Sequence, residues 1–150
     1  MKKNQQMTKL IRGVRNAFNR LRALGDRMHG YLEVTAAMRA IMEALSSLGP
    51  MTVPQIAKLK GVSRQHVQLL ADALCAAELV TVRENPMHRR SLLIDLTAKG
   101  KATFTKMTAR EAPVIAELAR GFSAQEMDCA IVVLERLSLR VGALLAEKSE

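Results

Sequence analysis

The chain has 150 residues, of which 49% are hydrophobic and 25% charged, a balance typical of one globular domain with its own core. Lysine and arginine outnumber aspartate and glutamate by 23 to 14, and the formal net charge of +9 favours a polyanionic partner, most often nucleic acid. The sequence shows no membrane span and no signal peptide, and with 3% aromatic residues it lacks the ring platforms of single-strand binders.

The first predicted element is a long helix over Met7–His29. Its apolar residues recur at steps of four and three, a heptad seam that suits packing against another helix. The seam consists of Leu10, Val14, Ala17, Leu21, Leu24 and Met28, widened by Ile11 and Phe18. The opposite face, which we interpret as solvated, carries Lys9, Arg12, Arg15, Arg20 and Arg22.

The next segments predict two shorter helices. Apolar periodicity favours a helix over Thr35–Ser47, ended by a Gly-Pro pair. Thr52 and Gln55 then fit a capping box, in which each side chain bonds the other residue's backbone amide. This cap predicts a short helix as far as Lys60.

A glycine turn leads into the following helix. Gly61 breaks the short helix, Val62 is expected to be a buried anchor, and Ser63 caps a helix to about Ala77. Its predicted inward residues are Val67, Leu70, Ala71 and Leu74. Two helices joined in this way, the second opening with polar and cationic side chains, form a helix-turn-helix, whose recognition helix reaches base edges in the major groove.

After this helix the apolar period falls to two, which predicts a β-hairpin. The alternating apolar residues are Val80 and Val82 in the first strand and Leu92, Ile94 and Leu96 in the second. An Asn-Pro turn and a basic tip with Arg89 and Arg90 lie between the strands. A ribbon at this place is the wing of a winged helix, and its tip would place guanidinium groups in the minor groove beside the duplex.

Two helices complete the chain. Thr97 is expected to cap a helix to about Arg120, with a kink at Pro113 because the proline ring displaces a backbone hydrogen bond. A second capping box, Ser123–Glu126, opens a helix to about Lys148. Its apolar side carries Met127, Ile131, Leu134, Val141 and Leu145. Together with the first helix, these stripes exceed what one winged-helix core can cover, so we expect a partner surface.

The stretch from Met51 to Gly100 resembles the winged helix-turn-helix core of the MarR family of bacterial transcriptional regulators. The matching residues are Ile56-Ala57, Val62-Ser63, Val67, Asp72, Leu74, Leu79-Val80, the Asn-Pro turn, Arg90 and Leu96-Thr97-x-x-Gly100. The flanking helices fit the family's layout, so the resemblance covers nearly the whole chain. It implies a cytoplasmic, nucleoid-associated homodimer, built from the terminal helices, that binds palindromic operator DNA and is released by a small ligand or by oxidation.

Four positions depart from the family pattern. His88 stands where the family usually has an aspartate that helps to brace the wing arginine. Val82 stands where arginine is usual, although Arg83 lies next to it on the outer face, and Leu69 occupies a position that is frequently basic. Glu78 replaces the usual glycine, at a cost of roughly 1 kcal/mol if the backbone there is left-handed.

Cysteine and histidine give no sign of a catalytic or metal site. Cys75 and Cys129 form no disulfide framework, and we expect Cys75 to be a buried structural thiol rather than a redox switch. His29, His66 and His88 show no metal-ligand spacing with the cysteines. The sequence has no phosphate loop and no nucleophile paired with a base, so we predict no enzyme, no catalytic residue, no cofactor and no metal.

Five methionines fall on helical stripes, where flexible thioethers fill gaps in a core. They are Met28, Met38, Met42, Met107 and Met127. The family resemblance implies that a subset could line an apolar ligand pocket between the dimerisation helices and the winged helix.

We therefore predict a mainly α fold with a small β-hairpin wing. The winged helix-turn-helix DNA-binding domain spans 35–100, and N- and C-terminal helices over 1–34 and 101–150 form a dimerisation region. The predicted function is that of a homodimeric regulator of double-stranded DNA, a repressor of inverted-repeat operators relieved by a small apolar or aromatic ligand. The predicted DNA-binding residues are Ser63, Arg64, Gln65, His66, Gln68, Arg83, Arg89 and Arg90.

Within this set we assign Gln65, His66 and Gln68 to bases, and Ser63, Arg64, Arg89 and Arg90 to phosphate or the minor groove. Two alternatives stay open. One is a winged-helix module for protein association, whose charge only confers solubility. The other is a sequence-tolerant architectural DNA-binding protein without effector control.

Overall fold

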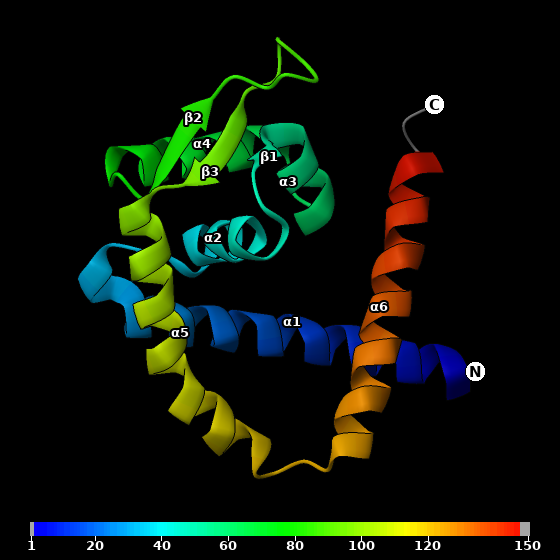
Figure 1. Cartoon of the computed structure of the whole chain (residues 1–150). Helices are drawn as coiled ribbons and strands as arrows, with labels where there is room; N and C mark the ends of the chain where they lie inside the picture. Colours follow the sequence, from blue (N-terminus) through cyan, green and yellow to red (C-terminus); the bar gives the residue numbers. More distant parts are fainter. Residues whose placement is uncertain (1, 148–150) are drawn as a thin grey trace. The chain divides into compact units, whose positions relative to one another are not determined.

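The computed structural model describes residues 2–147 as a mainly helical fold with one small sheet (Figure 1). The elements are α1 (Lys2–His29), a 3-10 turn (Gly30–Leu32), α2 (Ala36–Leu48), β1 (Met51–Thr52), α3 (Val53–Lys60), α4 (Arg64–Ala76), β2 (Val80–Arg83), β3 (Leu93–Leu96), α5 (Ala98–Ala119) and α6 (Ala124–Glu147). The predicted fold class is confirmed. The chain divides after Thr108 into two compact units, a division by packing that leaves the functional boundaries at 34 and 100 as predictions.

The helix ends follow the predicted caps closely. The Thr35 hydroxyl accepts from Met38 N at 3.2 Å and starts α2. In the capping box of α3, Thr52 N donates to Gln55 Oε1 at 2.8 Å and Gln55 N donates to Thr52 Oγ1 at 3.3 Å. A second box opens α6, where Ser123 N donates to the Glu126 carboxylate at 2.8 Å. These short-range bonds explain why the helix starts could be predicted from local sequence.

The start of the first helix differs from the prediction, and the predicted end of the last helix has no counterpart among the described residues. The first helix begins at Lys2, five residues before the predicted start, because Lys2–Gln6 are polar residues with good helix propensity and no apolar marker. The predicted end of the last helix at Lys148 lies outside the described residues. Pro113 lies inside the continuous helix α5, and the kink expected there stays a prediction.

The sheet contains one strand more than predicted. Its order is β1-β3-β2, all antiparallel, with Ile94 of β3 opposite both Met51 and Val82. The two-residue strand β1 was missed because so short a segment has no periodicity. Strand β1 pairs with the edge of β3 that β2 leaves open, and this pairing joins the base of the wing to the core.

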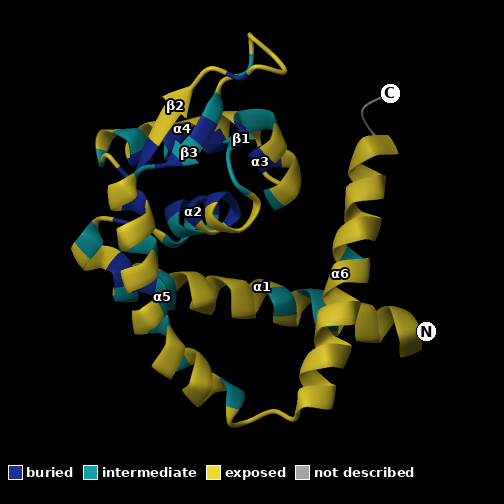
Figure 2. Cartoon of the chain, viewed as in Figure 1, coloured by how far each residue is buried: buried dark blue, intermediate teal, exposed yellow. Residues whose placement is uncertain are grey.

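The predicted buried side of the wing is correct only at its base. Val80, Ile94 and Leu96 are buried, but Val82 is 45% and Leu92 49% exposed, because the ribbon extends past the helices that cover its base (Figure 2). The expectation of a buried anchor at Val62 is also wrong, since this side chain is 41% exposed. Alternation therefore identified the strands but not how far the core reaches along them.

The core lies between α2, α3, α4 and the sheet (Figure 2). Its fully buried large side chains include Met42, Ile56, Leu74 and Met107. Met107 comes from α5, where Phe104 also lies under the Arg39 guanidinium at 5.4 Å from its carbon to the ring centroid. Of the predicted core methionines, Met127 is instead 39% exposed. The first half of α5 therefore packs as part of the winged-helix core.

A close backbone contact joins the end of α4 to the start of α5. The Thr97 hydroxyl donates to Glu78 O at 2.7 Å and accepts from Gly100 N at 2.9 Å, while Thr97 N donates to Leu79 O at 3.1 Å. Glu78 has φ 61°, which confirms the left-handed backbone at this position. A Cβ atom on buried Gly100 would lie 1.9 Å from Leu79 O. Only glycine fits at residue 100.

We predict that Gly100→Ala lowers the free energy of unfolding by about 3 kcal/mol or more, because the new methyl group meets a backbone carbonyl that cannot move alone. Urea denaturation followed by circular dichroism measures this change. The matched control is Gly13→Ala on α1, where nothing lies within 4 Å of the added Cβ and helix propensity favours alanine. Equal stability of the wild type and Gly100→Ala would contradict the close contact.

Candidate nucleic-acid interface

The helix-turn-helix consists of α3, the turn at Gly61 and α4. Gly61 has φ 66°, a left-handed conformation that lets the chain reverse, and the Ser63 hydroxyl then accepts from His66 N at 3.1 Å to cap α4. Arg64, Gln65 and His66 in the first turn are exposed, as is Gln68. The first turn contains no acidic residue, so the helix dipole and its open amides favour an anion there.

Gln68 is held by its own helix. Its Nε2 donates to Asp72 Oδ1 at 2.8 Å, which orients the amide plane. A carboxamide has a second N–H and a carbonyl oxygen, and both stay available for the bidentate contact with adenine. The hydrogen bond therefore restricts the rotamer of a predicted base-reading side chain without using up its donors and acceptors.

The wing tip is ordered by backbone turns. Asn85 is buried; its Oδ1 accepts from Met87 N at 3.1 Å and its carbonyl accepts from His88 N at 3.2 Å. A further turn follows, in which Ser91 N donates to the His88 carbonyl at 3.1 Å. The loop thus has an internal support that does not require the aspartate usual in the family at residue 88.

The arginines of the wing differ in their partners. Arg83 lies 3.6 Å from Asp95 of the neighbouring strand, so part of its charge is compensated. Arg89 and Arg90 are exposed and, within residues 2–147, form no ion pair. The uncompensated charge of the wing is therefore at its tip, where an approaching polyanion can reach it.

A hollow of about 380 Å³ separates α4 from the wing. Gln68 and Asp72 line it from α4, and Arg90 and Leu92 line it from the wing. The fold thus brings together one predicted base-reading residue and one predicted phosphate-binding residue. Arg89 lines a different hollow beside Glu84 and Pro86, and His66 faces a pocket between α4 and α1.

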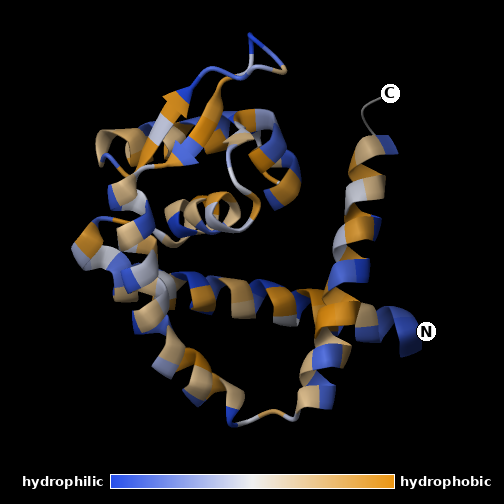
Figure 3. Ribbon diagram, in the orientation of Figure 1, coloured by the Kyte–Doolittle hydropathy of each residue, from blue (hydrophilic) through white to orange (hydrophobic). Residues whose placement is uncertain are grey.

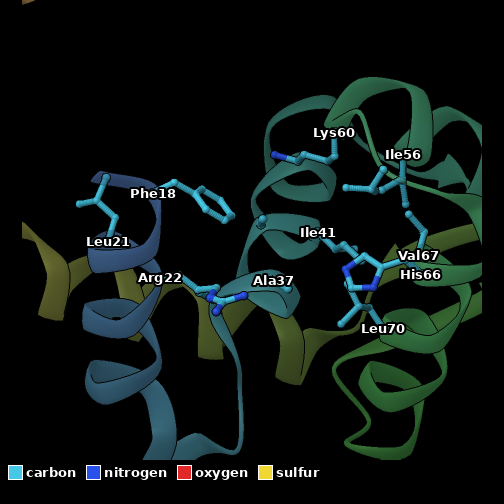
Figure 4. A pocket seen from close by; sticks show the side chains of 13 residues that line it. Phe18, Leu21, Arg22, Ala37, Ile41, Ile56, Lys60, His66, Val67 and Leu70 are labelled. Atoms are coloured by element: carbon cyan, nitrogen blue, oxygen red, sulfur yellow. The ribbon is translucent and has the colours of Figure 1, made fainter. Parts of the chain in front are cut away.

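This second pocket, of about 370 Å³, lies between α1, α2, α3 and α4 (Figure 4). Its walls are mainly apolar and include Phe18, Leu21, Ile41 and Leu70. Its basic side chains are Arg22, Lys60 and His66, and the Lys60 ammonium also lies 3.8 Å from Glu43. Among residues 2–147 no methionine lines it, contrary to the expectation that some of the stripe methionines would. The family resemblance implied a pocket in this region, but its lining could not be assigned from the sequence, because residues expected in a seam or as an anchor, such as Val62, form its walls.

Cys75 lines the hollow between α4 and the wing and is half-buried rather than fully buried. Burial raises the pKa of its thiol above the ordinary value of 9.0, and the Asp72 carboxylate adds to the rise. Cys129 on α6 is exposed. In the part of the chain described, no three His, Cys, Asp or Glu side chains are grouped to hold a metal ion, and none of the helices has the length and apolar character to span a bilayer.

We predict slow alkylation of Cys75 near neutral pH, because a raised pKa leaves less thiolate and the rate climbs only as the pH approaches that pKa. The measurement is iodoacetamide labelling of a Cys129→Ser variant, native and urea-unfolded, followed by mass spectrometry from pH 7 to 10. Asp72→Asn should raise the native rate by up to about fivefold, because it removes one nearby negative charge. A native thiol that reacts faster than the unfolded one at pH 7 would contradict the environment described.

A helix-turn-helix followed by a β ribbon defines a winged helix-turn-helix protein. The crystal structure of MarR family transcription regulator SP03579 matches this chain with a TM-score of 0.77 and 30% identity, over 97% of this chain and 95% of that one. The chain belongs to the MarR family of transcription regulators.

Other comparisons agree with this assignment. The uncharacterised protein Rv2011c of Mycobacterium tuberculosis is 32% identical over 147 residues, which cover 97% of this chain and 99% of that protein. A cysteine-to-serine mutant of MarR from E. coli, complexed with operator DNA, shares the fold with a TM-score of 0.78 at 20% identity, over 88% of this chain and 95% of that one. No family model matches the sequence.

Proposed function

We propose that the protein is a homodimeric, sequence-specific DNA-binding transcription regulator that represses inverted-repeat operators. The observation that carries this proposal is the arrangement of Gln68 and Arg90, which line one hollow from the recognition helix and from the wing. A duplex whose major groove receives α4 would have the wing tip beside it. The likeness in fold to E. coli MarR, which was solved with operator DNA, supports this proposal.

The roles within the interface follow from chemistry and exposure. Gln65, His66 and Gln68 carry donors and acceptors that match base edges. Arg64, Arg89 and Arg90 are exposed cations suited to phosphate or a narrow minor groove. The Ser63 oxygen accepts from a backbone amide, and its hydroxyl proton is still able to bond a phosphate. We assign Arg83 a smaller share because Asp95 compensates part of its charge.

The homodimer is supported by the apolar side of α6. Ile131, Leu134, Val141 and Leu145 are 52%, 43%, 46% and 64% exposed, and Figure 3 shows repeated hydrophobic residues along this helix. Monomeric soluble proteins rarely leave so long an apolar stripe uncovered, and a second copy is the partner always available. In a two-fold dimer, recognition helices about 34 Å apart would meet successive major grooves on one duplex.

We predict different effects of Gln68→Ala and Arg90→Ala on DNA binding. Loss of the glutamine should cost about 1–3 kcal/mol on the preferred site and little on random duplex, because it removes base contacts. Loss of the arginine should weaken binding to both duplexes and reduce the salt slope by about 1. Selection from random DNA defines the preferred site, and fluorescence anisotropy at several salt concentrations measures affinity.

The control for charge is Lys106→Ala on α5, an exposed cation outside the interface. It should leave the preference and most of the affinity intact. Selection of a palindrome with half-sites one turn apart, bound by two chains, would support the dimer. Identical losses for Gln68→Ala on all sequences, or no preferred sequence at all, would contradict specific reading and favour an architectural role.

We further propose that a small aromatic or apolar acid relieves repression by binding in the pocket between α1 and α4. The mainly apolar walls suit a ring, and the Arg22 guanidinium and His66 imidazole offer partners for a carboxylate (Figure 4). His66 also belongs to the predicted DNA-reading surface. A ligand that fixes His66 in the pocket would therefore compete with its contact to a base.

We predict that a pocket ligand raises the melting temperature by about 5 °C at one hundred times its dissociation constant, since it binds only the native state. A thermal-shift screen that compares benzoate-like acids with their neutral amides tests whether Arg22 and His66 bind the carboxylate. Arg22→Gln should remove the advantage of the acids, and Ala37→Phe should remove binding by filling the pocket. Equal shifts for Ala37→Phe and wild type would place the ligand elsewhere.

A further inference from the structure

The net charge of the chain is concentrated in α1. This helix holds eight of the 23 basic residues and one of the 14 acidic residues, so it accounts for +7 of the net +9. Solvated helix faces in soluble proteins usually mix both signs. Eight cations against one carboxylate over 28 residues favour a polyanion rather than water alone.

The cations of α1 form a row along one face. Lys2, Lys9, Arg20 and Arg27 follow each other at seven, eleven and seven residues, which are close to two, three and two full turns. At 1.5 Å per residue the row is about 37 Å long. All four side chains are exposed and, among residues 2–147, none forms an ion pair.

This row points away from the winged-helix core. Phe18 faces the pocket shared with α2, α3 and α4 (Figure 4). Lys9 and Arg27 lie nine residues before and after Phe18, two and a half turns away, so they project from the opposite side of the helix. Arg20 follows Phe18 by two residues and also projects away from the core. A duplex held by α4 and the wing therefore does not reach the row.

Stability of α1 does not account for these cations. Lys2 and Lys3 occupy the first turn, where the helix dipole disfavours positive charge, and that turn has no acidic residue. The seam residues Leu10, Val14 and Leu24 project from a different side, so the row is also not needed for apolar packing. The charge of the row is therefore available to a partner outside the winged-helix core.

We propose that this cationic row of α1 binds the phosphate backbone of a second DNA duplex, so that the protein bridges two DNA segments. The length of the row matches about one turn of B-DNA, and an unpaired row of flexible side chains neutralises phosphates without reading bases. An anionic membrane fits less well. An interfacial helix needs an apolar face free to insert, whereas Phe18 and Leu21 of α1 line the pocket beside α2 and α4, and Leu24 is half-buried.

The inference goes beyond the proposed function, which needs only one duplex, and a capture experiment tests it with the full chain. Beads carry a 30-base-pair duplex with the selected site, and a labelled random duplex of the same length is added after the protein. The test variant replaces the row residues Lys2, Lys9, Arg20 and Arg27 with glutamine, which keeps helix propensity. The control replaces Lys101, Lys106, Arg136 and Arg140 with glutamine and changes the charge equally.

We expect the wild type and the control variant to capture the labelled duplex. The test variant should bind the beads but capture at least tenfold less. The salt slope for capture should fall by about 3 to 4 in the test variant, as four phosphate contacts are lost. Capture that persists in the test variant would overturn the proposal, because it would then arise from the two recognition helices of a dimer. Capture that falls equally in the control variant would also overturn it, because it would then depend on charge in general.

A second measurement separates this inference from the proposed function. Gln68→Ala combined with Arg90→Ala should lose preference for the selected site yet keep binding to random duplex that depends on the α1 row. Binding of this double variant to random duplex that is unchanged when the α1 row is also replaced would refute the row and leave the proposed function intact. Binding of the wild type to vesicles of phosphatidylcholine and phosphatidylserine at 3:1, with no row-dependent binding of duplex, would also refute it.

Discussion

The contact of Thr97 and Gly100 with the backbone of Glu78 and Leu79 is the constraint on which the DNA-facing surface depends. One hydroxyl bonds the end of the recognition helix at 2.7 Å and the start of α5 at 2.9 Å, and the absence of a Cβ lets the two backbones touch. Since Leu79 leads directly into β2, the same contact fixes where the wing leaves the core. The spacing of α4 and the wing tip is thus set by buried backbone geometry, which a surface substitution at the tip does not change.

The sequence predicted those parts of the fold that depend on local chemistry. Capping at Thr52, Ser63 and Ser123 involves atoms three residues apart, so helix starts could be located without tertiary information. Val62 was wrongly expected to be a buried anchor, because its exposure depends on how far the neighbouring helices extend. Strand β1 exists only through its pairing with β3, fixed by residues more than forty positions away.

The candidate site was predictable to a similar degree. Residue types and the order of helix, turn, helix and ribbon pointed to the surface that carries Gln68 and Arg90, and the structure places both beside one hollow. The partnership of Arg83 with Asp95 and of Gln68 with Asp72 depends on rotamers and register, which composition does not encode. The lining of the pocket behind α4 could not be assigned for the same reason, because cavities arise from imperfect packing between elements rather than from any motif.

Two of the proposed activities, control by a ligand and bridging of DNA, meet in α1 without competing for the same side chains. One side of this helix, with Phe18 and Arg22, forms a wall of the pocket that His66 enters from the recognition helix. Phe18 and Leu21 of the apolar seam line this same pocket, and the opposite side of the helix carries the cationic row. A ligand in the pocket touches both α1 and the first turn of α4, so it can shift the recognition helix α4 relative to the cationic row of α1. Because the pocket lies between the two proposed DNA contacts, loss of operator binding and loss of bridging would be two consequences of one displacement.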